Sequence, residues 1–473
     1  MMRHCRRSLL ALAAGPFLAA CNSGTPGDGS FAQPLEIESR VGVLDATLHV
    51  TLTESRIGER TVRGPAYNGT VPGPTLRVRP GDLVRIRLVN GMPPAPEGGE
   101  GEHDESDSTN LHFHGLHVSP EGRADNVSVH VHAGDSFDYE FRIPDEHPGG
   151  LYWYHPHHHG NVEYQLASGL SGAIVIENEL ETIPEVAIAR ERLLFINEIV
   201  IDENGDTTAS HAPGAGVTKL YPVNGVLDPT IAIAPGEVQR WRIAAANGDR
   251  FLKLKLDGHV LSQIALDGNT FAEPVEKDEI LLLPGNRVEV LVKGGAEGTY
   301  ALRALEYDRG FGGPVPEVTL ATVECAGRAA DQPLPAVLVP PPAGPSDASV
   351  VLERTFAFDV MIDGAAVTFG INRQAFDPDR IDASAVLGST EEWVIMDRVG
   401  EEHPFHVHVN PFQVIEVNGV PVADPVWQDT ALVPRYGAIK IRMTFADFTG
   451  RSVFHCHIAA HSDLGMMSAF EIY

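Results

Sequence analysis

A segment that occurs three times along the 473 residues limits the possible folds more than any other feature of the sequence. Each copy joins two short runs of apolar residues through a glycine, at Gly81, Gly236 and Gly388. After the first of these glycines apolar and charged residues alternate, and this period of two predicts a strand with one buried face. The glycines lie about 150 residues apart, which is the size of one domain. The repeat therefore predicts three tandem β-rich domains of one kind.

Composition favours an all-β class of sandwiches or barrels. The chain has 47 Gly and 35 Pro, and its short apolar runs are separated by Pro-Gly, Asn-Gly and Asp-Gly pairs, which are typical of turns between strands. No long segment has the 3.6-residue period of a helix. We expect domains at 31–178, 185–326 and 350–473, with the Pro- and Ala-rich residues 327–349 as an extended linker.

Residues 1–21 have the organisation of an export signal, with a basic start and an apolar run too short to span a bilayer. Arg6-Arg7 resembles a twin-arginine signal, the route for proteins that are exported already folded. Residues 18–21 resemble a lipobox, which would make Cys21 a lipid-anchored first residue. The alternative is an ordinary cleaved signal in which Cys21 has no role. Both interpretations predict a periplasmic or cell-envelope protein.

Charge and cysteine usage narrow the class of protein. A formal net charge of −29 argues against nucleic acid or an anionic membrane surface as partner, and its simplest consequence is solubility. Of the four cysteines, Cys5 and Cys21 lie in the leader and Cys456 lies between two histidines. This leaves Cys325 without an obvious partner. We therefore expect no disulfide framework, and we expect Cys325 to be a buried apolar residue.

The segment from His455 to Met466 combines five side chains that suit metal ions. On a strand, His455 and His457 point to one face and Cys456 points to the other, so this tripeptide would serve two metal sites. A cysteine and a histidine with a weak methionine ligand suit a copper electron-transfer site. The peptide that joins Cys456 to its flanking histidines would be a covalent electron path, and the segment predicts a redox protein.

Four clusters of histidine, each with a His-x-His or His-Cys-His spacing, lie in the first and third predicted domains. They contain His112, His114, His155, His157, His403, His406, His408, His455, His457 and His461. Buried imidazoles without metal would leave many polar nitrogens to satisfy. A structural zinc site uses four ligands, and eight paired imidazoles exceed that number. The remaining set is His403, Cys456, His461 and Met466. It has the two-His, one-Cys, long-Met pattern of a blue-copper centre.

Through these four motifs the chain resembles the multicopper oxidases, which are built from three tandem cupredoxin-like Greek-key β-sandwich domains. The resemblance covers almost the whole mature chain and implies four copper ions. The ligands of the type 1 copper would be His403, Cys456, His461 and Met466. The ligands of the type 2 copper would be His112 and His406. The ligands of the type 3 pair would be His114, His155, His157, His408, His455 and His457. The trinuclear cluster would lie between domains 1 and 3, with domain 2 as a spacer.

Asp125 falls where the family has an acidic residue that brings protons to the cluster. The glycine that usually follows is Asn126 here, and the alternative interpretation of Asp125 is a turn residue. Five further histidines near the motifs are expected to be supporting or surface groups. They are His117, His130, His132, His158 and His159.

The resemblance implies that a substrate gives single electrons to the type 1 copper, that these pass through Cys456, and that four of them reduce dioxygen to two waters. A laccase-like enzyme would oxidise phenols and aromatic amines at an open site beside His461 or His403. The alternative is a cuprous or ferrous oxidase of the copper-tolerance type. Its cuprous form carries a Met-rich insertion, and the eight methionines here form no such segment, so the laccase-like function is favoured.

Two other functions fit the motifs less well. Copper nitrite reductases have two domains and fewer ligand histidines. The copper-free cell-division scaffold of this family has lost the ligands, which are intact here. The expected partners are therefore dioxygen and a small phenolic or metal-ion reductant.

Overall fold

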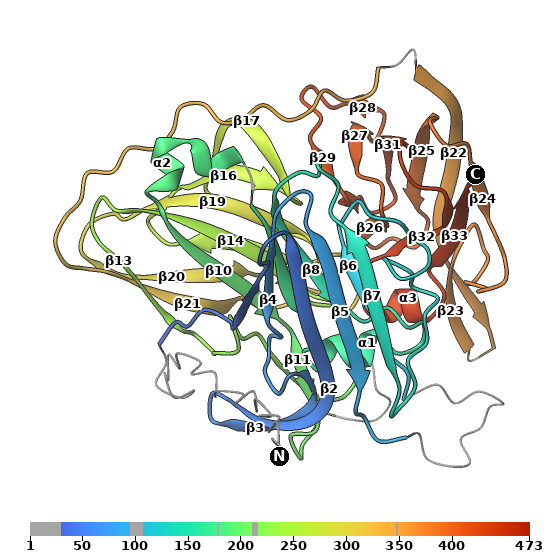
Figure 1. Ribbon diagram of the computed structural model, residues 1–473, viewed down its shortest axis with the longest axis horizontal. Helices are drawn as coiled ribbons and strands as arrows, with labels where there is room; N and C mark the ends of the chain where they lie inside the picture. The colour runs from blue at the N-terminus through green and yellow to red at the C-terminus, as the bar shows by residue number, and fades with distance from the viewer. Residues whose placement is uncertain (1–29, 95–106, 178, 211–215, 347–348, 365) are drawn as a thin grey trace, which may run out of the picture.

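The computed structural model describes residues 30–94, 107–177, 179–210, 216–346, 349–364 and 366–473. The predicted export signal, with Arg6, Arg7 and Cys21, lies outside these ranges. Strands dominate, and three groups of sheets lie side by side (Figure 1): blue to cyan in the centre, green to yellow on the left, and orange to red on the right. The predicted all-β class is confirmed. Within the described ranges the helices are η1 (Glu179–Thr182), α1 (Val162–Ala167), α2 (Pro184–Ala187) and α3 (Ala459–Asp463). None of them is long and apolar enough to cross a membrane.

The first sandwich consists of the sheets β1-β4-β9-β8-β6 and β3-β2-β5-β7. Its strands are β1 (Glu36–Glu38), β2 (Val43–Ile57), β3 (Arg60–Tyr67), β4 (Thr75–Val78), β5 (Leu83–Asn90), β6 (His112–His114), β7 (Ser136–Arg142), β8 (Gly150–His155) and β9 (Gly172–Ile176). One core joins the two sheets, with Leu76 and Tyr154 from the first and Leu48 and Ile86 from the second.

The second sandwich consists of the sheets β10-β14-β19-β16-β17 and β13-β21-β20-β15-β18, with a short ribbon of β11 and β12 beside them. Its strands are β10 (Arg190–Asn197), β11 (Ile199–Ile201), β12 (Thr218–Leu220), β13 (Thr230–Ile233), β14 (Val238–Ala246), β15 (Leu252–Leu256), β16 (Leu261–Leu266), β17 (Asn269–Lys277), β18 (Ile280–Leu282), β19 (Arg287–Lys293), β20 (Gly298–Leu305) and β21 (Val318–Cys325). Cys325 lies in the core between these sheets, as predicted.

The third sandwich consists of the sheet β23-β22-β25-β31-β27-β28, with β29 paired to β27, and the sheet β24-β33-β32-β26-β30. Its strands are β22 (Val350–Asp363), β23 (Ala366–Ile371), β24 (Ala383–Ala385), β25 (Thr390–Asp397), β26 (His403–Val407), β27 (Phe412–Val417), β28 (Val420–Pro421), β29 (Trp427–Gln428), β30 (Thr430–Val433), β31 (Ala438–Thr444), β32 (Gly450–Cys456) and β33 (Met467–Ile472). Each sandwich comes from one stretch of the chain, and the domain limits given above remain predictions.

The threefold repeat of the sequence is also a repeat of topology. Gly81 joins β4 to β5, Gly236 joins β13 to β14, and Gly388 joins β24 to β25, and at each step the chain passes from one sheet to the opposing sheet. The three glycines have φ of 84°, 73° and 82°, a conformation that costs glycine little because it has no Cβ. The second strand of each unit then pairs in parallel with β2, β10 or β22. One supersecondary unit therefore organises all three sandwiches.

The predicted alternation holds in the first copy of the repeat. Val84, Ile86 and Leu88 are buried, whereas Arg85 and Arg87 face solvent.

The second copy differs, because both faces of β14 are covered, one by the core of its own sandwich and the other by residues of the first sandwich, and all of its residues are buried. Arg240 and Arg242 are accommodated there since each lies 2.6 Å from a carboxylate oxygen of Glu289 on β19. The alternating pattern did not predict this buried ion-pair network, because an arginine at such a position is usually exposed.

Candidate metal centres

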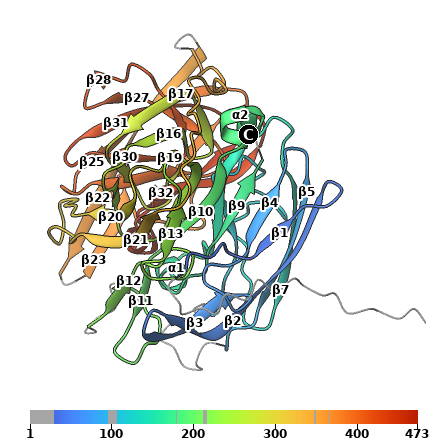
Figure 2. The same cartoon turned by 90° about the vertical axis from the view of Figure 1, so that its left-hand side faces the viewer.

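Strand pairing brings the four histidine motifs together two by two. In the first sandwich β6 pairs with β8, and His112 stands opposite His155. In the third sandwich β26 pairs with β32, and His406 stands opposite His455. Since side chains of residues i and i+2 share a face, each pair of strands presents a set of imidazoles on one side. Figure 2, turned by 90° from Figure 1, shows the strands of the first sandwich (blue) and those of the third (orange and red) in separate parts of the molecule.

The imidazoles of both terminal sandwiches meet in two buried triads. The triads are His114, His155 and His457, and His157, His408 and His455. In the first triad His457 Nε2 lies 3.2 Å from His114 Nδ1. In the second, His455 Nε2 lies 3.1 Å from His157 Nε2 and 3.2 Å from His408 Nε2. Each triad therefore joins histidines of the first and third sandwiches, and each offers three nitrogens to one metal ion.

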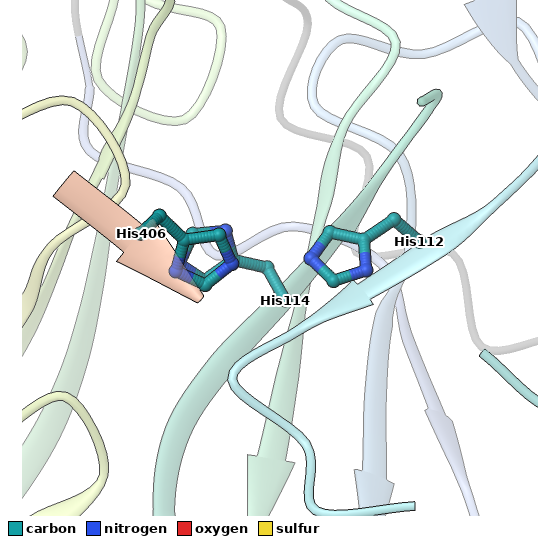
Figure 3. Close-up of side chains that lie close together, drawn as sticks. All are labelled: His112, His114 and His406. Atoms are coloured by element: carbon teal, nitrogen blue, oxygen red, sulfur yellow. The ribbon is translucent and has the colours of Figure 1, made fainter. Parts of the chain in front are cut away.

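His112 and His406 approach each other beside the first triad. Figure 3 shows His112 and His114 on one strand and His406 arriving from the third sandwich, with the His114 and His406 rings overlapping. These two rings are stacked with centroids 3.9 Å apart, and those of His112 and His406 are 5.7 Å apart. One ligand atom from each of the three histidines lies within 4.8 Å of the others.

Hydrogen bonds leave one nitrogen free on several of these rings. His112 Nδ1 donates to Asp125 at 2.8 Å, and His406 Nδ1 donates to the backbone oxygen of Asp429 at 2.8 Å. His155 Nδ1 donates to a backbone oxygen at 2.9 Å. The Nε2 atoms of these three histidines are buried and have no hydrogen-bond partner in the described part of the chain. Buried polar atoms are rarely left unpaired, so this donor set fits metal ions.

The protonation state of the rings suits metal binding as well. Burial lowers the pKa of His155 and of His455 to about 3, and their neighbouring imidazoles contribute. Burial also holds the pKa of His112 well below its usual value. Neutral imidazole is the form that binds metal, so no proton has to leave these rings at neutral pH.

A second kind of site surrounds Cys456. Its Sγ lies 3.5 Å from His403 Nδ1 and 3.7 Å from His461 Nδ1, and all three side chains are buried. Met466 is also buried, and its backbone is tied to this site by hydrogen bonds with Cys456 at 3.1 Å and with His461 at 2.8 Å. Burial raises the pKa of the Cys456 thiol, so a bound cation has to displace the thiol proton. Sulfur with two imidazoles is the donor set of a copper electron-transfer site.

Acidic and aromatic side chains surround His403 and His461, beside which we expected the substrate site. His403 is fully buried and His461 is 4% exposed. His461 stacks on Phe369 with ring centroids 4.2 Å apart. Carboxylates lie near the outer ring nitrogens, at 3.4 Å from His403 Nε2 to Asp397 and at 3.9 Å from His461 Nε2 to Glu401. In the described part of the chain, the carboxylates of Asp397 and Glu401 and the ring of Phe369 border these two rings.

Asp125 lies inside the histidine cluster, and it is 2% exposed. Its Oδ1 accepts hydrogen bonds from the Phe113 backbone and from His112 Nδ1, both at 2.8 Å. Its Oδ2 lies 3.8 Å from His408 Nδ1. Burial raises the pKa of Asp125 to about 8, although the Phe113 N–H opposes this shift. Burial therefore favours the protonated form of this carboxyl group, which lies within reach of the cluster.

Three residues beside the cluster were missed at the sequence level. Asp429 Oδ1 accepts a hydrogen bond from His114 Nε2 at 3.1 Å, which leaves Nδ1 of that ring for metal. The Arg287 guanidinium binds both oxygens of Asp429, at 2.8 and 2.6 Å. A Cβ at Gly285 would stand 3.0 Å from a ring carbon of His114. No spacing marks these residues, because a lone aspartate, arginine or glycine carries no pattern.

Comparisons with known proteins agree with this geometry. Sequence profiles described as multicopper oxidase match residues 49–181, 152–322 and 345–473. The chain is 26% identical over 416 residues to the multicopper oxidase mco of Staphylococcus aureus, which covers 86% of this chain and 83% of that protein. It is 26% identical over 471 residues to a laccase of Bacillus subtilis (strain 168), covering 86% of this chain and 89% of that protein. A solved structure of a multicopper oxidase from Campylobacter jejuni, described as a metallo-oxidase, has a TM-score of 0.80 and 27% identity, covering 94% of this chain and 95% of that chain.

Cupredoxin-like sandwiches that carry a thiolate site and a joined histidine cluster define a copper-dependent oxidoreductase. The matched profiles span most of the sequence. The chain belongs to the multicopper oxidase family, whose members bind four copper ions and use dioxygen.

Proposed function

We propose that this protein oxidises its reductant one electron at a time at the Cys456 site and reduces dioxygen to water at the histidine cluster. The type 1 ligands are His403, Cys456, His461 and Met466. The type 2 ligands are His112 and His406. The type 3 ligands are the two triads defined above. Copper held at these sites supplies the redox chemistry, in which four electrons and four protons convert one dioxygen to two waters.

One observation carries the proposal, the placement of three consecutive residues. His455 and His457 belong to different triads, while Cys456, which lies between them in the sequence, belongs to the thiolate site. Two peptide links therefore connect the two kinds of site without a gap in covalent bonding. Asp125 is buried against His112 and its pKa is raised by burial, and it is the group that we assign to proton delivery.

The copper-loaded protein tests this proposal. We expect an intense visible band from thiolate-to-copper charge transfer, which Cys456→Ser abolishes, and four electrons consumed per dioxygen. The variant keeps every histidine of the two triads, so it should still bind copper there. A colourless wild-type protein, or one that holds no copper, would overturn the proposal and leave a copper-free scaffold.

The acidic groups around His403 and His461 favour a small metal cation, cuprous or ferrous, as reductant. Asp397 and Glu401 face the two outer ring nitrogens. Arg309 pairs with both Glu401 and Asp249, and Lys219 pairs with Asp249 and Glu198, so the carboxylates of this network outnumber its cationic groups. The chain as a whole has a net charge of −29, which attracts cations. The oxidation of phenols stays a prediction, supported by the relatives that are named laccase.

Glu401→Gln separates the two reductants. With Fe(II) we expect kcat/KM to fall about tenfold, since one charge is lost beside His461, while the value for a phenol stays unchanged. Glu353→Gln, at an exposed ion pair with Lys440, makes the same change of charge elsewhere and serves as control. Equal effects of Glu401→Gln on both reductants would contradict a metal-ion site at this position.

The leader supports a further part of the proposal, export to the periplasm or cell envelope. Arg6-Arg7 would direct the folded protein outward, and Cys21 is the candidate for lipid attachment. Mass spectrometry of the mature protein tests both, because a lipidated Cys21 would be the first residue.

A further inference from the structure

Three histidines outside the copper motifs gather at one end of the first sandwich. His158 follows His157 of the second triad directly, and it is 5% exposed. His130 and His132 have the same His-x-His spacing as the copper motifs, and both are exposed to solvent. The intervening Val131 pairs with Thr109 and holds this segment in place. The sequence indicated supporting or surface roles for these histidines.

The contact between His158 and His130 has the geometry of the metal-binding pairs of this chain. His158 Nε2 lies 3.2 Å from His130 Nδ1, with ring centroids 4.6 Å apart and planes at 80°. In the second triad, His157 and His455 have nitrogens 3.1 Å apart, centroids 4.9 Å apart and planes at 72°. Two nitrogens that bind one ion at 2.0–2.1 Å stand about 2.9 Å apart as neighbours in a square-planar arrangement and about 3.3 Å apart in a tetrahedral one, and the distance here lies between these values. The pair is therefore spaced to share one ion.

Oxygen donors and a negative charge lie next to this pair. His132 Nδ1 lies 2.8 Å from Ser108 Oγ and 3.8 Å from Asp107 Oδ1. The rings of His130 and His132 have centroids 6.5 Å apart. Because both of these rings face solvent, an ion reaches the pair without passing through the protein. Neutral imidazoles suit copper and zinc, and among divalent ions copper binds such sites most tightly.

We propose that His130 and His158 bind a fifth copper ion, in its divalent state, separate from the copper of the two sites described above. The ligands are His130 Nδ1 and His158 Nε2, and Asp107 contributes negative charge beside the neighbouring His132. This site is open to solvent on the His130 side, so its ion exchanges with free copper while the buried copper does not. Its existence does not depend on the identity of the reductant.

A copper titration of the copper-loaded protein tests the proposal. Cu(II) is added to protein from which loosely held copper has been removed with a mild chelator, and binding is followed by calorimetry and by electron paramagnetic resonance. We expect wild-type protein to bind one further Cu(II), and we expect His130→Ala to bind it at least tenfold more weakly. The blue absorption and the oxygen uptake without added copper should be the same in both proteins.

Two further variants keep the result interpretable. His49→Ala removes an exposed histidine on β2 of the same sandwich and should leave the additional ion bound. His158→Gln should lose the additional ion as His130→Ala does. Equal Cu(II) affinity of wild type and His130→Ala would overturn the fifth site. A failure of the proposed oxidase function would appear instead as a missing blue band in all of these proteins, and it would leave the comparison of their Cu(II) affinities valid.

Discussion

Asp125 has two roles. It accepts a hydrogen bond from His112, and it is a buried acid within the cluster. Its Oδ1 orients the His112 ring, and its Oδ2 is turned towards His408. Asparagine keeps the shape and an acceptor oxygen but cannot carry the proton. Alanine removes both functions. Substitutions at this residue therefore separate orientation from proton transfer.

We predict that Asp125→Asn keeps its copper but loses turnover by a factor of about 10² to 10⁴, the usual contribution of a positioned acid. Asp125→Ala should in addition bind the copper at His112 about 10- to 100-fold more weakly. Oxygen uptake measures the first effect, and the type 2 signal in electron paramagnetic resonance measures the second. Asp125→Asn with full turnover would favour the alternative interpretation of this residue as a turn former.

His147 is a buried histidine outside the metal sites, and its titration affects stability. Its Nε2 accepts from the His117 backbone N–H at 2.9 Å, and its Nδ1 donates to Pro148 at 2.8 Å. Burial lowers its pKa from 6.5 to about 4. Between pH 6.5 and about pH 4, His147 is protonated in the unfolded chain but stays neutral in the folded protein. Stability is therefore complete above pH 6.5 and falls as the pH drops towards 4.

We predict that lowering the pH from 7 to 4 reduces the unfolding free energy by up to about 3 kcal/mol through His147, at 1.36 kcal/mol per pKa unit. His147→Gln does not titrate, so its unfolding free energy should depend less steeply on pH. Urea unfolding of wild type and variant at several pH values between 4 and 7 measures the difference. Parallel pH profiles of the two proteins would show that His147 is not the group concerned.

At the scale of elements, the turn between β18 and β19 brings the second sandwich against the histidine cluster. Gly285 in this turn has φ of 94°, and its N–H donates to Ala245 at 3.0 Å. A Cβ there would stand 3.0 Å from His114 and 3.1 Å from His457, closer than most real contacts. The second sandwich, which the sequence suggested was a spacer, thus supplies part of the cluster wall.

We predict that Gly285→Ala lowers oxygen uptake about a hundredfold, because displaced rings of His114 and His457 lose the reactive geometry. The blue band of the Cys456 site should remain. Gly327→Ala is a matched control, since Gly327 has φ of 98° with nothing within 4 Å of an added Cβ. Both variants bear the backbone strain of an alanine at positive φ, and only the first should lose activity. Equal activities of the two variants would contradict this role of the turn.

At the scale of the whole molecule, one buried arginine connects all three sandwiches. Arg287 of the second sandwich pairs with Asp429 of the third and donates to the Leu151 backbone of the first at 3.1 Å. Asp429 in turn accepts from His114 at 3.1 Å. The pKa of Asp429 lies well below its usual value because, although burial opposes ionisation, Arg287 stabilises the charge. The charge pair therefore couples domain contacts to the metal ligands.

We predict that Arg287→Met costs about 3–5 kcal/mol of unfolding free energy, because it leaves Asp429 as a buried, unpaired charge. It should also lose copper at His112 and His406 while the Cys456 site keeps its colour. Arg85→Met removes an exposed ion pair with Glu140 and should change stability by less than about 0.5 kcal/mol. Arg287→Met with full type 2 copper would limit this arginine to a structural role.

The sequence predicted the all-β class and marked the repeat and the four histidine motifs, because each of these depends on local spacing. The assignment of the motifs to particular coppers came from the resemblance to the family and stays a prediction. The period of two places His455 and His457 on one face, and it needs no knowledge of the rest of the chain. The division of the histidines into triads depends on which strands pair and how the sandwiches dock. The contacts of Arg287 and Asp429 could not be predicted from local spacing either, since their partners are distant in sequence. The setting of His461 was also beyond local spacing, because Phe369 and Glu401 come from other segments.

Each histidine triad takes its ligands from the first and third sandwiches, and this affects the stability of the protein in the cell. An ion that is bound by histidines of both sandwiches binds only when the two sandwiches are in contact. Its binding free energy therefore stabilises the interface between the first and third sandwiches. At free metal a hundredfold above its Kd, one such ion adds about 2.7 kcal/mol to the closed state. Copper at the triads would therefore stabilise the contact between the two sandwiches as well as take part in the reaction. In a cell short of copper, the first and third sandwiches would separate first at this interface. The opened protein would then be degraded by proteases, so its abundance would depend on the copper supply.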